Sequence, residues 1–224
     1  MRYLLLSLLL LLCTGLAVAA EPGDPRAGAI TFGRYCLACH GQEYQRFDRV
    51  AADLHLDLAS WAPGHTASAP MLGLLKPEDA RRAFGSVPPD LTLIAAVRGE
   101  AWLRAFLQEF YAAPGRPLGV DNLKAPGTRM PDVLAALRGR QVRDCNDGRC
   151  VLRLEPGSGA QTPEQFARTV DDLVAYLGYS AAPERRLAWR LAPWVLGYLL
   201  LFAVLAFWLK REFWRRLPDS ERRD

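Results

Sequence analysis

Two apolar runs stand near the ends of the chain, and amphipathic segments fill the stretch between them. The first run covers residues 4–12, broken only by Ser7, and the second covers residues 191–209 without a charged side chain. As a helix, the second run rises about 28 Å, close to the thickness of the hydrocarbon core of a bilayer. The pattern therefore predicts a membrane-spanning helix near the C-terminus and a short apolar segment at the N-terminus.

The first run has the features of a secretory signal peptide. Arg2 precedes it, and small residues follow it at positions 17–20. These are the charged, apolar and cleavage regions of such a signal. We expect residues 1–20 to form the signal, with cleavage after Ala19 or Ala20, which also removes Cys13. An uncleaved membrane anchor is the alternative, which the shortness of the run disfavours.

The second run is predicted as a transmembrane helix over residues 187–210. Trp194 and Trp208 lie towards its two ends, and basic residues follow it closely, as at a membrane boundary. The alternative is a buried helix of a soluble core, but the rest of the chain is too small to surround it. A signal peptide and a later transmembrane helix place residues 21–186 outside the cytoplasm and residues 211–224 inside it as a tail.

Between the runs, the periodicity and the signals for helix ends predict a mainly α-helical domain. The predicted helices cover residues 27–40, 77–85, 91–98 with Asp90 as N-cap, 100–112, 131–139 with Pro131 in the first turn, and 163–178. In the fourth helix Trp102, Phe106 and Phe110 share one face, a pattern typical of core packing. Thr162 and Gln165 form a capping box ahead of the last helix, which Gly178 is expected to end.

The charge distribution excludes one class of protein. The chain has 224 residues, with 28 basic and 24 acidic side chains and a net charge of +4. Residues 21–189 contain twenty of each sign, so the excess lies at the two ends. A nucleic-acid-binding domain carries a basic patch on itself. We therefore expect no nucleic-acid partner.

The strongest chemical signal is the segment of residues 36–40, which reads C-x-x-C-H. This is the pattern of c-type haem attachment. Cys36 and Cys39 are spaced to reach the two vinyl groups of one haem, and His40 is placed to bind its iron. The alternatives are a thioredoxin-like redox pair and half of a zinc site. The remaining cysteines have the wrong spacing for zinc, so we expect one covalently attached haem c.

Met130 is predicted as the second axial ligand of this haem. It lies in a segment rich in Pro and Gly, directly before Pro131. Met71, His55 and His65 are the other candidates, and an open sixth position is a further alternative. Met71 fits a packing role and the two histidines fit exposed polar roles. A thioether ligand raises the haem potential above that of a haem with two imidazole ligands.

Cys145 and Cys150 flank a four-residue segment that contains Asp147-Gly148, a favoured two-residue hairpin turn. Cysteines facing each other across such a hairpin lie within disulfide range. The compartment outside the cytoplasm permits oxidation. We expect a structural disulfide that closes a hairpin over residues 141–154, with a redox-active pair as the alternative.

These elements together predict a mainly α fold: a class I cytochrome c-like haem domain with a small disulfide-closed β-hairpin, plus one C-terminal transmembrane helix. In class I cytochromes c the first and last helices cross and clamp the haem. The segment between His40 and Met130 is long for a small soluble carrier of this class.

Several segments resemble the cytochrome c1 family, the haem subunits of quinol–cytochrome c oxidoreductase (the cytochrome bc1 complex). They are residues 35–40, 46–49, 85–95 with the sequence Pro-Pro-Asp-Leu, 130–134 with Met-Pro, 173–177 and 182–184. The resemblance covers residues 25–217, and the Pro-Pro-Asp-Leu and Met-Pro segments are more specific than C-x-x-C-H. Gly41 stands where many members have serine, a departure we expect to be harmless.

The resemblance implies single-electron relay. Members of the family accept electrons from the Rieske iron–sulfur protein and pass them to a cytochrome c, while cytochrome b oxidises quinol. The chain is thus expected to be a non-catalytic subunit of an enzyme complex, itself a dimer. The implied location is the bacterial inner membrane, crossed once, with the haem domain on the periplasmic side.

The resemblance also implies a role for Arg98, which matches a family arginine near a haem propionate. Its alternative role is a cation that favours a helix C-terminus. The rival functions are another tethered monohaem cytochrome c that feeds a terminal oxidase or reductase, a haem-based sensor, and an anchored binding protein without redox chemistry.

Overall fold

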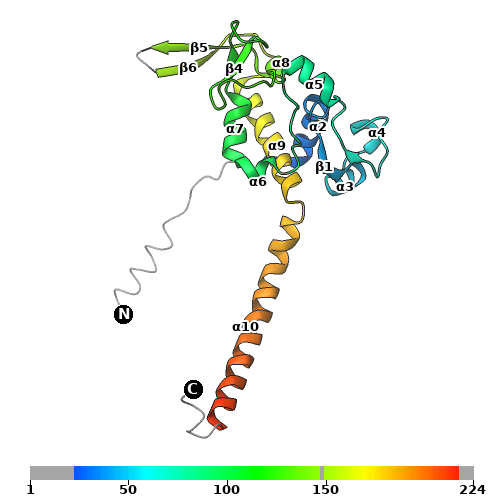
Figure 1. Cartoon of the computed structure of the whole chain (residues 1–224), viewed down its shortest axis with the longest axis vertical. Helices are drawn as coiled ribbons and strands as arrows, with labels where there is room; N and C mark the ends of the chain where they lie inside the picture. Colours follow the sequence, from blue (N-terminus) through cyan, green and yellow to red (C-terminus); the bar gives the residue numbers. More distant parts are fainter. Residues whose placement is uncertain (1–22, 147–148, 217–224) are drawn as a thin grey trace. The chain divides into compact units, whose positions relative to one another are not determined.

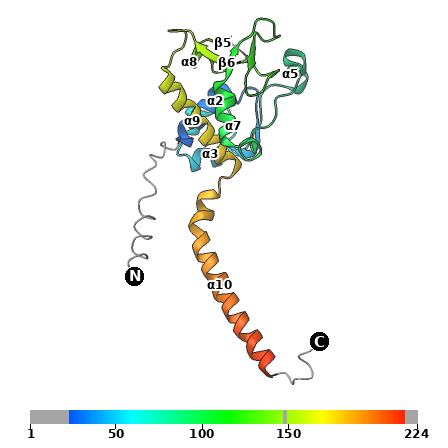
Figure 2. The ribbon, with the colours of Figure 1, turned by 90° about the vertical axis from the view of Figure 1, so that its left-hand side faces the viewer.

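The computed structural model describes residues 23–146 and 149–216, which divide into two units at the Ala181–Ala182 junction (Figure 1). The second unit contains one long helix, α10 (Arg185–Arg216), which is continuous in both views (Figures 1 and 2). Over Leu187–Arg215 it is long and apolar enough to cross a membrane, and no residue of its most apolar stretch is buried. The predicted signal peptide, Cys13 and the last eight residues of the predicted tail lie outside the described residues.

The first unit consists of short helices and three two-stranded antiparallel sheets. The helices are α2 (Pro25–Tyr35), α3 (Phe47–Asp53), α4 (Leu58–Trp61), α5 (Pro77–Phe84), α6 (Ile94–Arg98), α7 (Glu100–Gln108), α8 (Ala135–Arg138) and α9 (Pro163–Ala181). The sheets pair β1 (Gln42–Arg46) with β2 (Pro70–Met71), β3 (Phe110–Ala112) with β4 (Val120–Asn122), and β5 (Gln141–Asn146) with β6 (Arg149–Leu154). The predicted mainly helical composition is confirmed, as is the hairpin β5–β6; the first two sheets were not predicted.

The core forms where α2 packs against α9, the first and last described helices of this unit. A Cβ atom on Gly28 would lie 1.9 Å from the carbonyl oxygen of Asp172, so the two backbones meet where only glycine fits. Beside this contact the rings of Phe32 and Tyr176 pack with their centroids 5.3 Å apart. The backbone N–H of Asp24 donates to the Asp172 carboxylate at 2.7 Å. The predicted pairing of the first and last helices is confirmed.

The end of α5 and the start of α9 agree with the capping residues in the sequence, but the end of α9 does not. Gly85 caps α5 with φ 70°, in the left-handed region that favours glycine. At α9 the Gln165 side chain accepts from the Thr162 N–H at 2.9 Å, and Thr162 Oγ1 accepts from the Gln165 N–H at 3.3 Å, so the capping box is confirmed. The prediction that Gly178 ends α9 is wrong, because the helix continues to Ala181.

Four other predicted helix limits are also wrong. The first helix ends at Tyr35, before the C-x-x-C-H turn, and α7 ends at Gln108 because residues 110–112 pair with β4. Helix α6 begins at Ile94, although the Asp90 carboxylate binds the N–H groups of Glu43 and Thr92, both at 2.8 Å. Helix α8 begins at Ala135, which leaves Pro131 outside it.

Candidate haem-binding site

A cavity of about 350 Å³ lies among α2, α6, α7 and α9 and the segments that precede α6 and α8. Its walls are largely apolar. The four side chains predicted to hold a haem line it together: Cys36, Cys39, His40 and Met130. Met130 is far from the other three along the chain, and the fold brings it to the same cavity.

The two cysteines follow the last turn of α2. The Cys36 N–H donates to the Phe32 carbonyl at 2.9 Å, and the His40 N–H donates to the Cys36 carbonyl at 2.8 Å, which makes a compact turn. Both thiols are free, and burial raises the pKa of the Cys36 thiol to about 12. A thioredoxin-like pair depends on a thiol whose pKa is lowered. The redox-pair alternative therefore does not fit this site.

His40 is held in one tautomer by a backbone carbonyl. Its Nδ1 lies 2.8 Å from the carbonyl oxygen of Pro89. A carbonyl oxygen only accepts, so Nδ1 carries the proton and the lone pair of Nε2 is free to bind a metal. Burial lowers the pKa of His40, which favours the neutral ring that a metal ligand requires.

The Pro-Pro-Asp-Leu segment thus acts through its backbone as well as its side chains. While Pro89 orients His40, the Leu91 N–H donates to the Gly41 carbonyl at 2.8 Å and fastens the chain that follows the histidine. A Cβ atom on Gly41 would lie 3.0 Å from the Gly73 nitrogen, so the glycine at this position suits the close packing. The role of the Pro89 carbonyl was not predicted, because a carbonyl contact leaves no signature in residue types.

Met130 is the one proposed sixth ligand that shares the cavity with His40. Met71 is 0% exposed and belongs to the core. His65 packs on the Phe47 ring, with centroids 4.5 Å apart, and His55 is exposed. None of these three, all of which the structure describes, lines the cavity.

The predicted aromatic face is confirmed for Trp102 and Phe106, which form one wall of the cavity, whereas Phe110 lies in β3 and does not line it. Trp102 and Phe106 line it and stack with their centroids 5.0 Å apart, and Phe106 meets Phe110 edge-on at 5.1 Å. The Arg98 guanidinium lies 5.0 Å from the centroid of the Trp102 ring. Arg98 also lines the cavity, which places a cation beside an otherwise apolar wall.

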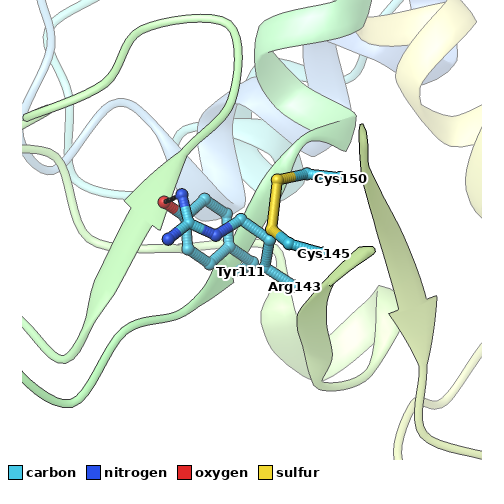
Figure 3. The surroundings of a disulfide bond; sticks show 4 residues. All are labelled: Tyr111, Arg143, Cys145 and Cys150. Atoms are coloured by element: carbon cyan, nitrogen blue, oxygen red, sulfur yellow. Dashed lines mark hydrogen bonds between the residues drawn. A yellow bond between two sulfur atoms is a disulfide. The ribbon is translucent and has the colours of Figure 1, made fainter. Parts of the chain in front are cut away.

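Cys145 and Cys150 face each other across β5 and β6 and are joined, so the predicted disulfide is confirmed (Figure 3). The predicted turn at Asp147-Gly148 lies outside the described residues. Arg143 fastens the hairpin to β3: its Nη1 donates to the Tyr111 hydroxyl at 3.0 Å (Figure 3). The two cysteines do not line the cavity, which favours the structural reading over a redox partnership with it.

The donor set fits a haem c better than it fits zinc. Within residues 23–146 and 149–216 no three His, Cys, Asp or Glu side chains gather as a metal site would require. The cavity instead offers two unjoined thiols one turn apart, an oriented imidazole, a thioether and apolar walls. Each of these matches what haem attachment and axial ligation need.

No protein-family model matches the chain. The chain is 30% identical, over 250 aligned positions, to cytochrome c1 of Allochromatium vinosum; the match covers 96% of this chain and 99% of that protein. It is 36% identical, over 202 aligned positions, to a protein of Nitrosomonas europaea named ammonia monooxygenase gamma subunit, with 88% of this chain and 84% of that protein covered. The first match thus extends over nearly the full length of both chains.

Proposed function

Because the chain belongs to the cytochrome c1 family, we propose that it carries one covalently attached haem c and relays single electrons from the Rieske iron–sulfur protein to a cytochrome c. The family comprises the haem-containing electron-transfer subunits of the cytochrome bc1 complex, whose other members include cytochrome b and the Rieske protein. The observation that carries the proposal is the one cavity lined by Cys36, Cys39, His40 and Met130.

The haem, when bound, supplies reversible one-electron chemistry at its iron. Cys36 and Cys39 would hold it through thioether bonds, and His40 and Met130 would bind the iron. The Pro89 carbonyl keeps the His40 ring oriented, so little movement of this ligand accompanies electron transfer. The apolar wall of Trp102 and Phe106 would surround the haem with a largely apolar environment.

The helix α10 supports anchoring in a membrane, as in a single-pass subunit. The predicted signal peptide would place the haem domain on the periplasmic side of a bacterial inner membrane. In this proposal residues 21–186 form the haem domain, residues 187–210 cross the membrane and residues 211–224 form the cytoplasmic tail. The complex would be a dimer, with cytochrome c as the electron acceptor.

Arg98→Ala is expected to lower the midpoint potential of the haem by about 30–60 mV, since loss of a nearby cation favours the more positive ferric iron. A redox titration of the full-length protein in membranes measures this shift. Arg82→Ala is the control, because it removes an exposed cation that does not line the cavity. Equal potentials in the two variants would leave Arg98 only its role at the end of α6.

Purification of the tagged full chain from detergent-solubilised membranes tests the proposed function. We expect cytochrome b and the Rieske protein to accompany it, and quinol to reduce its haem only when the Rieske protein is present. Recovery of the haem-loaded chain without cytochrome b would favour a tethered carrier that serves a terminal oxidase or reductase. Recovery with the other subunits of a monooxygenase would favour the role that the name of the second relative describes.

A further inference from the structure

Two residues beyond Met130 the chain makes a buried ion pair. The Asp132 carboxylate accepts from Arg138 Nη2, and these two side chains are only 8% and 5% exposed. Arg138 is the last residue of α8, and its guanidinium lies 5.7 Å from the centroid of the Phe166 ring in α9. The pair therefore connects the segment that carries Met130 to both of these helices.

Stability alone is a poor explanation for such a pair. Removing two charges from water costs several kcal/mol per ion, and apolar residues of similar size often stabilise a protein as well or better. The Arg138 guanidinium is also incompletely satisfied, because Nε and Nη1 are buried without a hydrogen-bond partner among the described residues. A buried pair with these costs instead specifies one geometry for the segment it holds.

The covalent path from Asp132 to Met130 is short and stiff. The two Cα atoms are at most about 7 Å apart, and Pro131 between them has a nearly fixed φ. Between the two members of the pair, Leu134 is 2% exposed and packs in the core. A displacement of Asp132 is therefore passed on to Met130 with little loss.

On its other side Met130 is held less firmly. Arg129 Nη1 donates to the Gly85 carbonyl, but this side chain is exposed. The Met130 N–H lies 3.4 Å from Thr128 Oγ1, a long hydrogen bond. The buried anchor on the C-terminal side is thus the stronger of the two.

We propose that the Asp132–Arg138 ion pair is a positioning element that keeps the Met130 thioether at the sixth coordination position of the haem iron. The proposal rests on the proposed function in so far as Met130 is that ligand. If the pair is broken, Met130 leaves the iron more readily. An added ligand such as imidazole, which competes with Met130, then binds more tightly.

Asp132→Asn tests the proposal in the haem-loaded full chain. It removes the charge but keeps the size of the side chain and an acceptor oxygen. We expect ferric protein to bind imidazole about tenfold more tightly, the factor that corresponds to about 1.4 kcal/mol. The red-region charge-transfer band of methionine-ligated ferric haem should weaken in parallel. Arg138→Lys, made separately, keeps the charge. Its imidazole affinity should therefore lie between those of the unmodified protein and Asp132→Asn.

Glu155→Gln is the matched control. It breaks the ion pair of Glu155 with Arg140, at 2.6 Å; the Arg140 and Glu155 side chains are 58% and 41% exposed and do not line the cavity. We expect imidazole affinity to stay unchanged in this variant. Equal affinities in Asp132→Asn and Glu155→Gln would overturn the proposal.

A double variant separates positioning from stability. Asp132→Leu combined with Arg138→Met removes both charges, so resistance to unfolding by urea should largely recover. A positioning role predicts that imidazole affinity stays high in this variant; recovery of both properties together would contradict it. This variant also serves if Asp132→Asn does not fold.

Met130→Leu distinguishes failure of this proposal from failure of the proposed function. If Met130→Leu changes imidazole affinity and Asp132→Asn does not, only the positioning role is lost. If Met130→Leu leaves the affinity unchanged, Met130 is not the ligand. The positioning role is then lost, together with the assignment of Met130 in the proposed function.

Discussion

Met130→Leu is expected to leave the haem attached but to lower its midpoint potential by on the order of 0.1 V, part of the roughly 0.8 V range that axial ligands span. The leucine side chain keeps the apolar bulk at the cavity wall but offers no lone pair to the iron. Loss of a thioether ligand removes the contribution that raises the potential of a His/Met haem. A redox titration of the full-length protein in membranes measures the shift.

Met71→Leu is the control for this experiment, because it makes the same change at a buried methionine that does not line the cavity. It should leave the potential unchanged and cost less than about 1.5 kcal/mol of stability. Equal potentials in the two variants would contradict the assignment of Met130.

The lowered potential has a consequence for electron flow. Each fall of about 59 mV reduces the equilibrium constant for one-electron reduction tenfold. The equilibrium constant for electron transfer from the Rieske protein to the haem of Met130→Leu should therefore fall by about tenfold or more. Quinol-dependent reduction of this haem should be nearly lost.

Gly28→Ala is expected to cost about 3 kcal/mol or more, at or beyond the upper end of the usual cost of overpacking. The added Cβ atom would lie 1.9 Å from the Asp172 carbonyl oxygen and 2.7 Å from the Tyr176 Cβ atom. Both contacts involve backbone or atoms fixed directly to it, so α2 and α9 must move apart. We expect the thermal unfolding midpoint of the full chain to fall by roughly 6–12 °C and less haem-loaded protein to accumulate in membranes.

Gly178→Ala provides the comparison on the partner helix. Its Cβ atom would lie 3.0 Å from Glu100 Oε1, the far end of an exposed and flexible side chain that can turn away. Alanine within a helix is also favoured over glycine by about 1 kcal/mol. Equal falls of the thermal unfolding midpoint in Gly28→Ala and Gly178→Ala would show that the close approach of α2 and α9 is not what requires Gly28.

Much of the site could be predicted because its chemistry is local in the sequence. The C-x-x-C-H turn needs no tertiary information, and the Pro/Gly-rich segment around Met130 marked it as a candidate ligand. The capping box at Thr162 and the hairpin closed by Cys145 and Cys150 were predictable for the same reason. Each depends on residues a few positions apart.

The rest depends on partners that are distant in the sequence. The Asp90 carboxylate accepts from the Thr92 N–H, as an N-cap does, but it also binds the N–H of the distant Glu43, and α6 begins only at Ile94. His40 was predicted as a ligand, but its hydrogen bond to the Pro89 carbonyl was not, because every residue has a backbone carbonyl. No sequence pattern marked Arg138, and only the fold shows that it is buried against Asp132.

The mass of the denatured full-length protein, isolated from membranes, tests the central claim most directly. The account predicts the mass of a chain that begins at residue 20 or 21 plus one haem, with the haem still on the peptide that contains Cys36 and Cys39 after proteolysis. Recovery of that peptide unmodified, with both thiols free, would contradict covalent haem attachment and with it the proposed electron relay.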